Sequence, residues 1–257
     1  MNVVILCAGF ATRMYPLTKN FPKPLLEVGG KRVLDYFIEQ INRLPEVETV
    51  HIVSNDKFYD HFENWRRQNE RSGIFGNYSV TVHNNGTVDN ETRMGAAGDL
   101  FLALEKIGTP GKVLVSGGDN IYQFSIKSMC EKFLTGTTHS ISALFETDIG
   151  KLQKTGVLEL AEDGRVVKLH EKPSQPPSSW ICPPLYFFQP SVWPILECFL
   201  TEPGNHDAPG YFIDYLCRQE TVMALKLNGS RLDIGSIGSF QQADMTLHQE
   251  PLDLEQM

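Results

Sequence analysis

A chain of 257 residues can bury one substantial hydrophobic core, and a composition of 41% apolar and 21% charged residues excludes an intrinsically disordered protein. The formal net charge of −8 argues against a general binder of nucleic acid, because such proteins carry clustered positive charge. Any phosphate site must therefore concentrate cations locally within an acidic surface.

The cysteines and the first residues bear on the compartment. The five cysteines are scattered and include no C-x-x-C pair, so we expect free thiols in a reducing compartment and no zinc site. The apolar run at residues 2–10 is too short to span a membrane, and it lacks the basic flank and cleavage pattern of a secretory signal. We therefore predict a cytoplasmic protein that does not act at membranes.

In the first half of the chain, segments typical of strands alternate with segments typical of helices. Runs of apolar or β-branched residues predict strands at residues 3–7, 49–54, 78–83, 113–116 and 140–145. Apolar residues at helical spacing predict helices at residues 33–44, 58–65, 97–107 and 125–134. This alternation is typical of βαβ units, with a mostly parallel sheet and helices on both faces.

The pattern changes after residue 150. Glu162-Asp163-Gly164 lies between strand-like segments at 156–160 and 166–170, which predicts a β-hairpin. A proline-rich stretch follows, and the remaining segments predict a strand at 185–188, helices near 191–200 and 211–219, a strand at 221–227 and a helix at 237–248. We predict a Rossmann-like three-layer α/β/α fold with a mostly parallel, mixed central sheet and a small inserted β-hairpin lobe. One domain would cover residues 1–250, followed by a tail at 251–257.

The loop after the first predicted strand has the composition of a phosphate site. In an open α/β sheet, ligands bind at the carboxyl ends of the strands, and small residues such as Gly9 let backbone N–H groups approach a phosphate. Arg13 offers a planar fork for phosphate oxygens, and Lys23, between two prolines, offers a point charge. The alternative is a surface loop with two solvated cations.

Two aspartates follow predicted strands at glycine turns. Asp119 comes after Gly117 and Gly118, and Asp233 comes shortly before Gly235. Carboxylates in such positions suit a hard cation such as Mg²⁺. The alternative for each is a helix cap or a turn stabilised by the aspartate side chain.

Residues 9–36, GFATRMYPLTKNFPKPLLEVGGKRVLDY, resemble the signature of the sugar-nucleotide pyrophosphorylase family, and glucose-1-phosphate thymidylyltransferases are the most similar common members. Further motifs follow in the same order along nearly the whole chain: Gly95-Ala96-Ala97-Gly98, Gly118-Asp119-Asn120, Glu171-Lys172-Pro173, Leu185-Tyr186-Phe187 and Leu232-Asp233-Ile234-Gly235. The resemblance implies a Mg²⁺-dependent nucleotidyltransferase that joins a nucleoside triphosphate and a sugar 1-phosphate into an NDP-sugar and pyrophosphate. It favours dTTP or UTP with a hexose 1-phosphate.

The resemblance also implies roles for individual residues. Those expected at the nucleotide are Leu6, Ala8, Gly9, Gly95 and, at a strand end facing the base edge, Asn84 or Asn85. Arg13 would bind the leaving pyrophosphate, Lys23 the reacting phosphates, and Asp119 with Asp233 the Mg²⁺. Those expected at the acceptor are Gly156, Glu171 and Lys172, with Glu171 at the sugar hydroxyls and Lys172 at the phosphate. Residues 1–150 would form the nucleotide-binding half, and residues 151–250 the acceptor-binding lobe and closing elements.

The chemistry of the implied reaction fits these residue types. Attack of a phosphate monoester on the α-phosphorus brings two polyanions together, so catalysis consists mainly of alignment and charge neutralisation, without a covalent nucleophile. The expected partners are therefore a nucleoside triphosphate and a phosphorylated small molecule, and neither nucleic acid nor membrane. Family members are often homo-oligomers, so the resemblance also implies a homo-oligomer.

Three departures from the family pattern leave the substrates open. Ala11 stands where the family usually has a second glycine, residues 86–94 form a longer polar insert, and Pro183-Pro184 replaces a Thr-Gly pair. The alternatives are a cytidylyltransferase that uses CTP with a sugar, polyol phosphate or phosphonate acceptor, and a non-catalytic nucleotide- or sugar-phosphate-binding regulator. A glycosyltransferase would normally need an Asp-x-Asp pair for its metal, whereas Asp119 precedes Asn120.

Two remaining features are expected to be structural. The seven histidines show no pair at metal-ligand spacing, so satisfied or solvated histidines are expected. The stretch GNHDAPGYF, residues 204–212, predicts a structured turn, with a lid or a subunit contact as the alternative.

Overall fold

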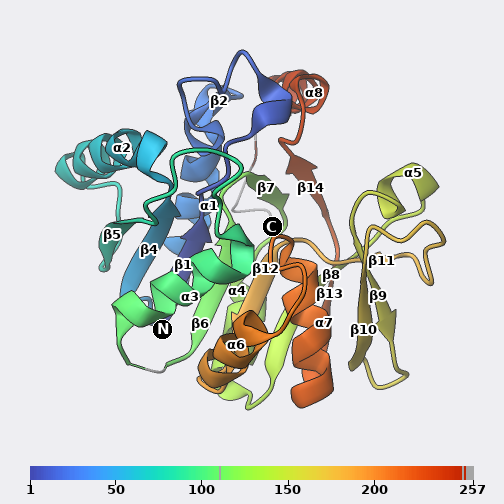
Figure 1. Cartoon of the computed structure of the whole chain (residues 1–257). Helices are drawn as coiled ribbons and strands as arrows, with labels where there is room; N and C mark the ends of the chain where they lie inside the picture. Colours follow the sequence, from blue (N-terminus) through green and yellow to red (C-terminus); the bar gives the residue numbers. More distant parts are fainter. Residues whose placement is uncertain (110, 251, 253–257) are drawn as a thin grey trace. The chain divides into compact units, whose positions relative to one another are not determined.

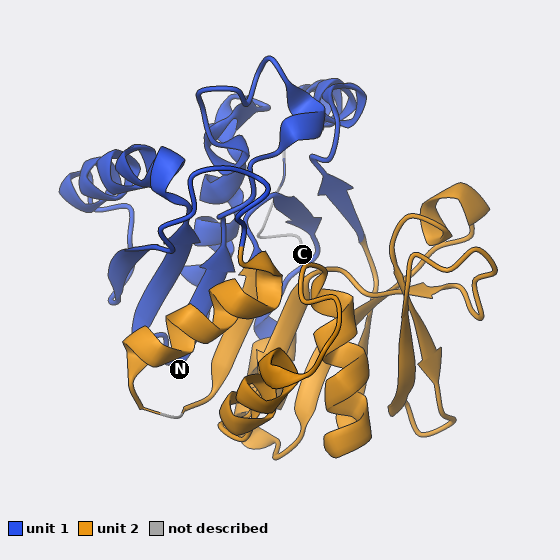
Figure 2. Cartoon of the chain, viewed as in Figure 1, with its two compact units in different colours: residues 1–93, 117–128, 230–257 blue, residues 94–116, 129–229 orange. Residues whose placement is uncertain are grey.

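The computed structural model describes residues 1–109, 111–250 and 252 (Figure 1). The chain divides into two compact units (Figure 2). Unit 1 comprises residues 1–93, 117–128 and 230–257, and unit 2 comprises residues 94–116 and 129–229. The predicted tail at 251–257 lies, apart from Leu252, outside the described residues.

Three parallel strands form the centre of unit 1. Strand β4 (Thr49–Ser54) lies between β1 (Asn2–Leu6) and β5 (Ser79–Asn84), and helices α1 (Val33–Ile41) and α2 (Tyr59–Arg71) occur between these strands in sequence. Leu6 pairs with Val53, and Ser54 pairs with Asn84. The three strands therefore end at the same edge, where the loop predicted to bind phosphate begins.

Smaller elements complete unit 1. They are η1 (Thr12–Met14), η2 (Lys23–Leu25), η3 (Asp56–Phe58), the hairpin of β2 (Glu27–Val28) with β3 (Lys31–Arg32), the antiparallel pair β7 (Asn120–Gln123) and β14 (Ser230–Asp233), and α8 (Ile237–Gln249). Buried Gln40 of α1 holds β7 in place: its Nε2 donates to the carbonyl oxygen of Tyr122 at 3.0 Å, and its Oε1 accepts from the N–H of Ile126 at 3.1 Å.

Unit 2 is a mixed sheet flanked by helices. Its strands lie in the order β10 (Val166–Glu171), β9 (Gly156–Leu160), β11 (Trp180–Ile181), β8 (His139–Phe145), β12 (Leu185–Phe188) and β6 (Val113–Gly117), each antiparallel to the next, while β13 (Val222–Leu227) pairs in parallel with β8. Its helices are α3 (Gly95–Ile107), α4 (Lys127–Thr135), α5 (Ile149–Leu152), α6 (Val192–Thr201) and α7 (Pro209–Gln219).

The predicted α/β class, with a mixed sheet and a β-hairpin lobe formed by β9 and β10, is confirmed. None of the helices within the described ranges combines the length and the apolar character that crossing a bilayer requires.

A buried histidine makes the stability of unit 1 depend on pH. His51 of β4 is 7% exposed, and its Nδ1 lies 2.9 Å from Nε2 of His83. Burial, together with the charge on His83, lowers the pKa of His51 from 6.5 to about 4. Between these values the unfolded chain binds a proton that the folded chain does not, so stability is lost as the pH falls through this window.

We therefore expect the Tm to fall between about pH 7 and pH 5, and His51→Gln to reduce that fall. Thermal unfolding at several pH values measures it, with His248→Gln on the exposed face of α8 as the control. The same pH dependence in wild type and His51→Gln would exclude His51 as its source.

Candidate active site

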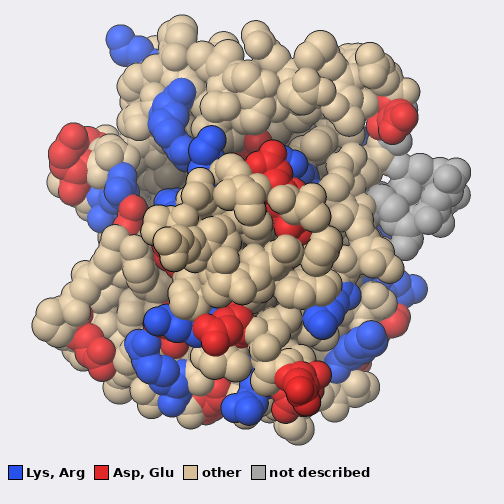
Figure 3. All heavy atoms as spheres, turned by 90° about the vertical axis from the view of Figure 1, so that its right-hand side faces the viewer, with Lys and Arg blue, Asp and Glu red and all other residues tan. Residues whose placement is uncertain are grey.

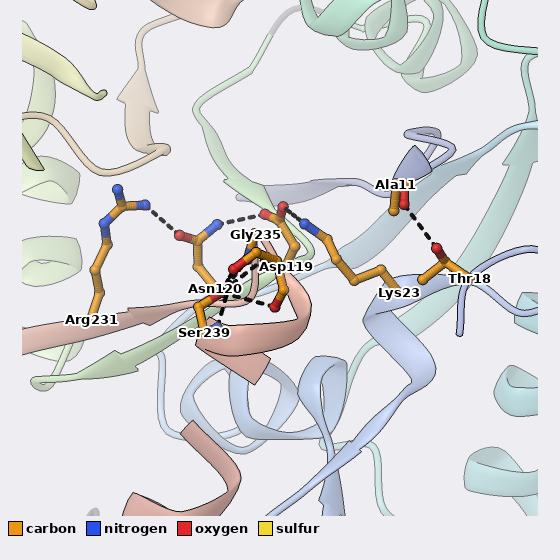
Figure 4. Close-up of polar contacts among 9 residues, drawn as sticks. Ala11, Thr18, Lys23, Asp119, Asn120, Arg231, Gly235 and Ser239 are labelled. Carbon is orange, nitrogen blue, oxygen red and sulfur yellow. Dashed lines mark hydrogen bonds and ion pairs between the residues drawn. The ribbon is translucent and has the colours of Figure 1, made fainter. Parts of the chain in front are cut away.

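Lys23 and Asp119 form an ion pair in unit 1, with Lys23 Nζ donating to Asp119 Oδ2 (Figure 4). The Lys23 side chain is 12% exposed and that of Asp119 is 35% exposed. Gly118 allows this approach, because a Cβ there would lie 2.3 Å from Cys7 Sγ and 3.4 Å from Pro24 Cγ. The absence of a side chain at Gly118 thus brings Asp119 beside the loop after β1 and beside η2.

The electrostatics of the pair keep Asp119 charged. Burial acts to raise the pKa of the Asp119 carboxyl, but the Lys23 ammonium and, more weakly, the Arg231 guanidinium outweigh burial and hold the pKa below its usual range. Asp119 is therefore a carboxylate at neutral pH, and its charge is matched by that of Lys23.

The second predicted metal ligand, Asp233, lies at the same end of the β7–β14 pair as Asp119. Asp233 is the exposed last residue of β14 and pairs with Asn120, the first residue of β7. The next residue, Ile234, donates its N–H to the carbonyl oxygen of Asp119 at 3.3 Å. The backbones that carry Asp119 and Asp233 are thus adjacent.

This donor set fits Mg²⁺, which proteins often bind through one or two carboxylates, with water and substrate phosphates as the remaining ligands. Over residues 1–109, 111–250 and 252, no three His, Cys, Asp or Glu side chains gather into a metal-binding cluster. The described chain therefore offers carboxylates for a shared site and no complete protein cage.

The chain from the end of β1 into the following loop is held by hydrogen bonds at Leu6 and Ala8 and is open at Gly9. Leu6 accepts a hydrogen bond from the N–H of Gly118 at 3.0 Å, and buried Ala8 accepts one from Asn55 Nδ2 at 2.9 Å. Gly9, the residue after Ala8, is exposed, and a Cβ added there would meet no heavy atom within 4 Å. Gly9 therefore faces open space that a ligand can use.

The next turn contains Ala11, which stands where the family pattern usually has a second glycine. Ala11 adopts a left-handed conformation with φ 49°, which costs more for alanine than for the glycine usual in the family. Its carbonyl oxygen accepts from Thr18 Oγ1 at 2.8 Å and from the N–H of Met14 at 2.9 Å, which fixes this turn (Figure 4). Arg13 lies exposed on η1 directly after it, so its guanidinium faces solvent.

Asn84, predicted to face the nucleotide base, lies at the end of β5 and is exposed. Its Nδ2 donates to Asp56 Oδ1 at 2.7 Å, and its Oδ1 accepts from the N–H of Gly86 at 2.8 Å. The alternative residue, Asn85, uses its Oδ1 to accept from the N–H of Thr87 at 2.9 Å. Both amides have partners within unit 1, and their role toward a base stays a prediction.

In unit 2, Gly95 begins α3 with φ 77°. A Cβ there would lie 2.6 Å from the carbonyl oxygen of His206 and 2.7 Å from Cα of Asp207. The N–H groups of Ala96 and Ala97 donate to the carbonyl oxygens of Asp207 and His206 at 3.1 and 3.4 Å. The turn predicted at 204–212 therefore covers the first turn of α3, a packing role for Gly95 that sequence reasoning missed.

The three predicted acceptor residues lie together on the β9–β10 hairpin of unit 2. Gly156 pairs with Glu171, and Lys172 Nζ lies 3.6 Å from Glu171 Oε1. The Glu171 side chain is 13% exposed and that of Lys172 is 62% exposed. Gly210 of α7 packs against this carboxylate, because a Cβ there would lie 2.1 Å from Glu171 Oε2. The predicted turn at 204–212 contains Gly210, but its contact with Glu171 was not predicted.

Burial of the Glu171 carboxylate lowers the stability of the folded chain. Burial raises the pKa of Glu171 above its ordinary value of 4.5, and the neighbouring Lys172 only partly opposes this. Above the folded-state pKa, the folded chain contains a poorly solvated carboxylate that is fully solvated when the chain unfolds.

We expect Glu171→Gln to raise the Tm at pH 7 and to lose most of this gain as the pH falls to about 4, where the wild-type carboxyl is mostly protonated in both states. Thermal unfolding at both pH values tests this, with Glu162→Gln in the exposed hairpin turn as the control. A Glu171→Gln variant less stable than wild type at pH 7 would contradict the expectation.

Comparisons with known proteins agree with the motifs. The bifunctional protein GlmU of Methanocaldococcus jannaschii is 27% identical over 241 residues, which cover 91% of this chain and 51% of the relative. The UTP–glucose-1-phosphate uridylyltransferase AglF of Haloferax volcanii is 26% identical over 255 residues, which cover 97% of this chain and 98% of the relative. The chain thus spans about half the length of its GlmU relatives and nearly the whole length of AglF.

A solved structure shares the fold. It is a Bacillus anthracis protein assigned as a glucose-1-phosphate thymidylyltransferase, in complex with sucrose, with a TM-score of 0.81 and 20% identity, and the alignment covers 98% of this chain and 97% of that chain. The sequence profile of the nucleotidyl transferase family matches residues 2–250. The resemblance inferred from the motifs is therefore confirmed, and the chain belongs to the nucleotidyl transferase family.

Proposed function

We propose that this chain transfers a nucleotidyl group from a nucleoside triphosphate to a sugar 1-phosphate, giving an NDP-sugar and pyrophosphate. The observation that carries the proposal is the Lys23–Asp119 pair beside an open glycine loop in a chain of this family. Relatives named for this chemistry support it, among them the uridylyltransferase AglF.

The residues of unit 1 suit the reaction between two polyanions. Lys23 supplies a positive charge for the reacting phosphates, and exposed Arg13 supplies a fork for the departing pyrophosphate. Asp119 and Asp233 are the residues that would hold Mg²⁺, which when bound supplies further positive charge to the phosphate oxygens. Leu6, Ala8 and Gly9 would line the nucleotide, with Asn84 at the base, and the family resemblance also implies a nucleotide role for Gly95.

The residues of unit 2 suit a phosphorylated acceptor. Glu171 would accept hydrogen bonds from sugar hydroxyls beside Gly156, and the exposed Lys172 would meet the phosphate. We favour UTP or dTTP with a hexose 1-phosphate, in line with the names of AglF and the Bacillus anthracis protein.

One observation keeps a different acceptor as the second candidate. Cys182, which directly precedes Pro183-Pro184, donates its N–H to the carbonyl oxygen of Gly156 at 2.9 Å. The rigid proline pair therefore follows the backbone that meets the predicted acceptor glycine. A cytidylyltransferase acting on CTP with a sugar, polyol phosphate or phosphonate is the corresponding alternative. A purely regulatory role is disfavoured, since Lys23 and Asp119 are present and paired.

We also propose that the protein forms a homo-oligomer and that it is cytoplasmic. No disulfide joins any of the five cysteines, all of which lie in the described part of the chain, and this agrees with a reducing compartment.

Pyrophosphate release tests the reaction. The protein is incubated with Mg²⁺ and each of the five common nucleoside triphosphates, against a panel of hexose 1-phosphates, polyol phosphates and phosphonates. We expect pyrophosphate only when both substrates are present, with the largest rate for UTP or dTTP and a hexose 1-phosphate. No pyrophosphate from any combination would contradict the proposed function.

Lys23→Met should lower kcat roughly 10²- to 10³-fold, because it removes a charge that stabilises the transition state. Lys31→Met is the matched control, since Lys31 forms an ion pair with Glu39 at 2.5 Å on the surface of the same unit. Equal rates for the two variants would show that Lys23 does not act on the substrate.

Gly9→Ala should weaken nucleotide binding roughly tenfold or more, about 1.4 kcal/mol, while leaving the Tm unchanged, because the added methyl meets only space predicted to hold nucleotide. Calorimetric titration with a non-hydrolysable nucleotide measures this. Gly238→Ala on α8, where an added Cβ also meets nothing within 4 Å, is the control. Unchanged affinity in Gly9→Ala would place the nucleotide elsewhere.

A further inference from the structure

A line of polar contacts runs from Arg231 to the Lys23–Asp119 pair within unit 1 (Figure 4). Arg231 Nη1 donates to Asn120 Oδ1 at 2.6 Å, and Asn120 Nδ2 donates to Asp119 Oδ1 at 2.7 Å. Asp119 Oδ2 accepts from Lys23. Each carboxylate oxygen of Asp119 therefore has a different donor.

Arg231 determines which way round the Asn120 amide lies. A guanidinium has only donors, so it must face the amide oxygen, and the NH₂ group then points toward Asp119. The reversed amide would place its oxygen against a carboxylate oxygen and its NH₂ against the guanidinium, and both contacts would be repulsive. Asn120 is 2% exposed, so water offers little substitute.

The strand register explains how one short strand supplies this group. In the antiparallel β7–β14 pair, Asp233 lies opposite Asn120 and Arg231 lies opposite Tyr122. Arg231 and Asp233 share a face of β14 because side chains alternate along a strand, and Arg231 is the diagonal neighbour of Asn120. Strand β14 thus carries Asp233, a predicted metal ligand, and Arg231. Arg231 orients Asn120, which is the neighbour of the other predicted ligand, Asp119.

We propose that Arg231 is a positioning residue for the transfer reaction, acting through Asn120 to fix the rotation of the Asp119 carboxylate against Lys23. The kinetic part of this inference rests on the proposed function. Without Arg231, the Asn120 amide is free to turn its oxygen toward Asp119, the carboxylate rotates away, and Lys23 loses the partner that holds its ammonium in place.

A double-mutant cycle tests the coupling. We expect Arg231→Met to lower kcat roughly tenfold with the KM for the acceptor within about twofold of wild type, since the predicted acceptor residues lie in unit 2. Arg231→Lys, which keeps a donor for Asn120 Oδ1, should recover most of the rate. In an Asn120→Ala background, Arg231→Met should cause a much smaller loss, because the amide through which it acts is gone and only its weaker direct charge effect on Asp119 remains.

Two outcomes would overturn the inference: additive losses in the cycle, which mean that Arg231 acts independently of Asn120, or no recovery in Arg231→Lys. Arg218→Met is the control for loss of an arginine, because Arg218 pairs with Asp214 on the exposed face of α7. The Tm of every variant is measured alongside, so that a loss of rate is compared only among folded proteins.

A readout independent of activity separates this inference from the proposed function. In protein labelled with ¹⁵N-asparagine, the side-chain amide resonances of Asn120 should shift in Arg231→Met and stay close to wild type in Arg231→Lys and Arg218→Met. If wild type releases no pyrophosphate, the proposed function fails. The resonances still show whether Arg231 orients the Asn120 amide. Asn120 resonances unchanged in Arg231→Met would refute that orientation.

Discussion

The contact between the Lys23 ammonium and the Asp119 carboxylate organises unit 1 of this protein. Removing two charges from water is costly, and attraction offsets that cost only when geometry and further hydrogen bonds are good. Gly118 provides the close approach, Gln40 anchors strand β7, and Asn120 satisfies the second carboxylate oxygen. So many supports around a partly exposed pair fit a role in ligand chemistry better than a role in stability alone.

The proposed reaction would bring two polyanions to an acidic protein, so the cations that meet them must be concentrated locally. On the face drawn in Figure 3, basic and acidic side chains are interspersed, and neither sign forms a large continuous patch. The cations proposed to act are few: exposed Arg13, Lys23 with its carboxylate partner, and exposed Lys172 beside the poorly solvated Glu171. Such an arrangement suits small phosphorylated ligands better than a phosphate backbone, which is bound by clustered positive charge.

Much of the fold could be predicted because its strands and helices are local patterns. The parallel strands of unit 1, the helices between them and the β9–β10 hairpin follow from periodicity and turn residues, and the motifs identified Lys23 and Asp119. The pair β7–β14 was not predicted, since two four-residue strands from distant parts of the chain carry little pattern of their own. The same holds for contacts between residues that lie far apart in the chain. Gly95 is required by the backbone of His206 and Asp207, Gly210 by the carboxylate of Glu171, and Arg231 acts on Asn120. Side chains alternate along a strand, so Arg231 shares a face of β14 with Asp233. This alternation is the one sequence feature that could have indicated Arg231.

The most direct test of the role of the Lys23–Asp119 pair is to remove both charges at once and to measure the Tm and the rate of pyrophosphate release on the same protein. The Lys23→Met/Asp119→Asn double variant leaves no unmatched charge, so the account predicts a Tm near that of wild type together with a loss of rate of roughly 10²-fold or more. A double variant that keeps the wild-type rate, or that loses its rate only because it unfolds, would contradict the claim that this pair serves catalysis.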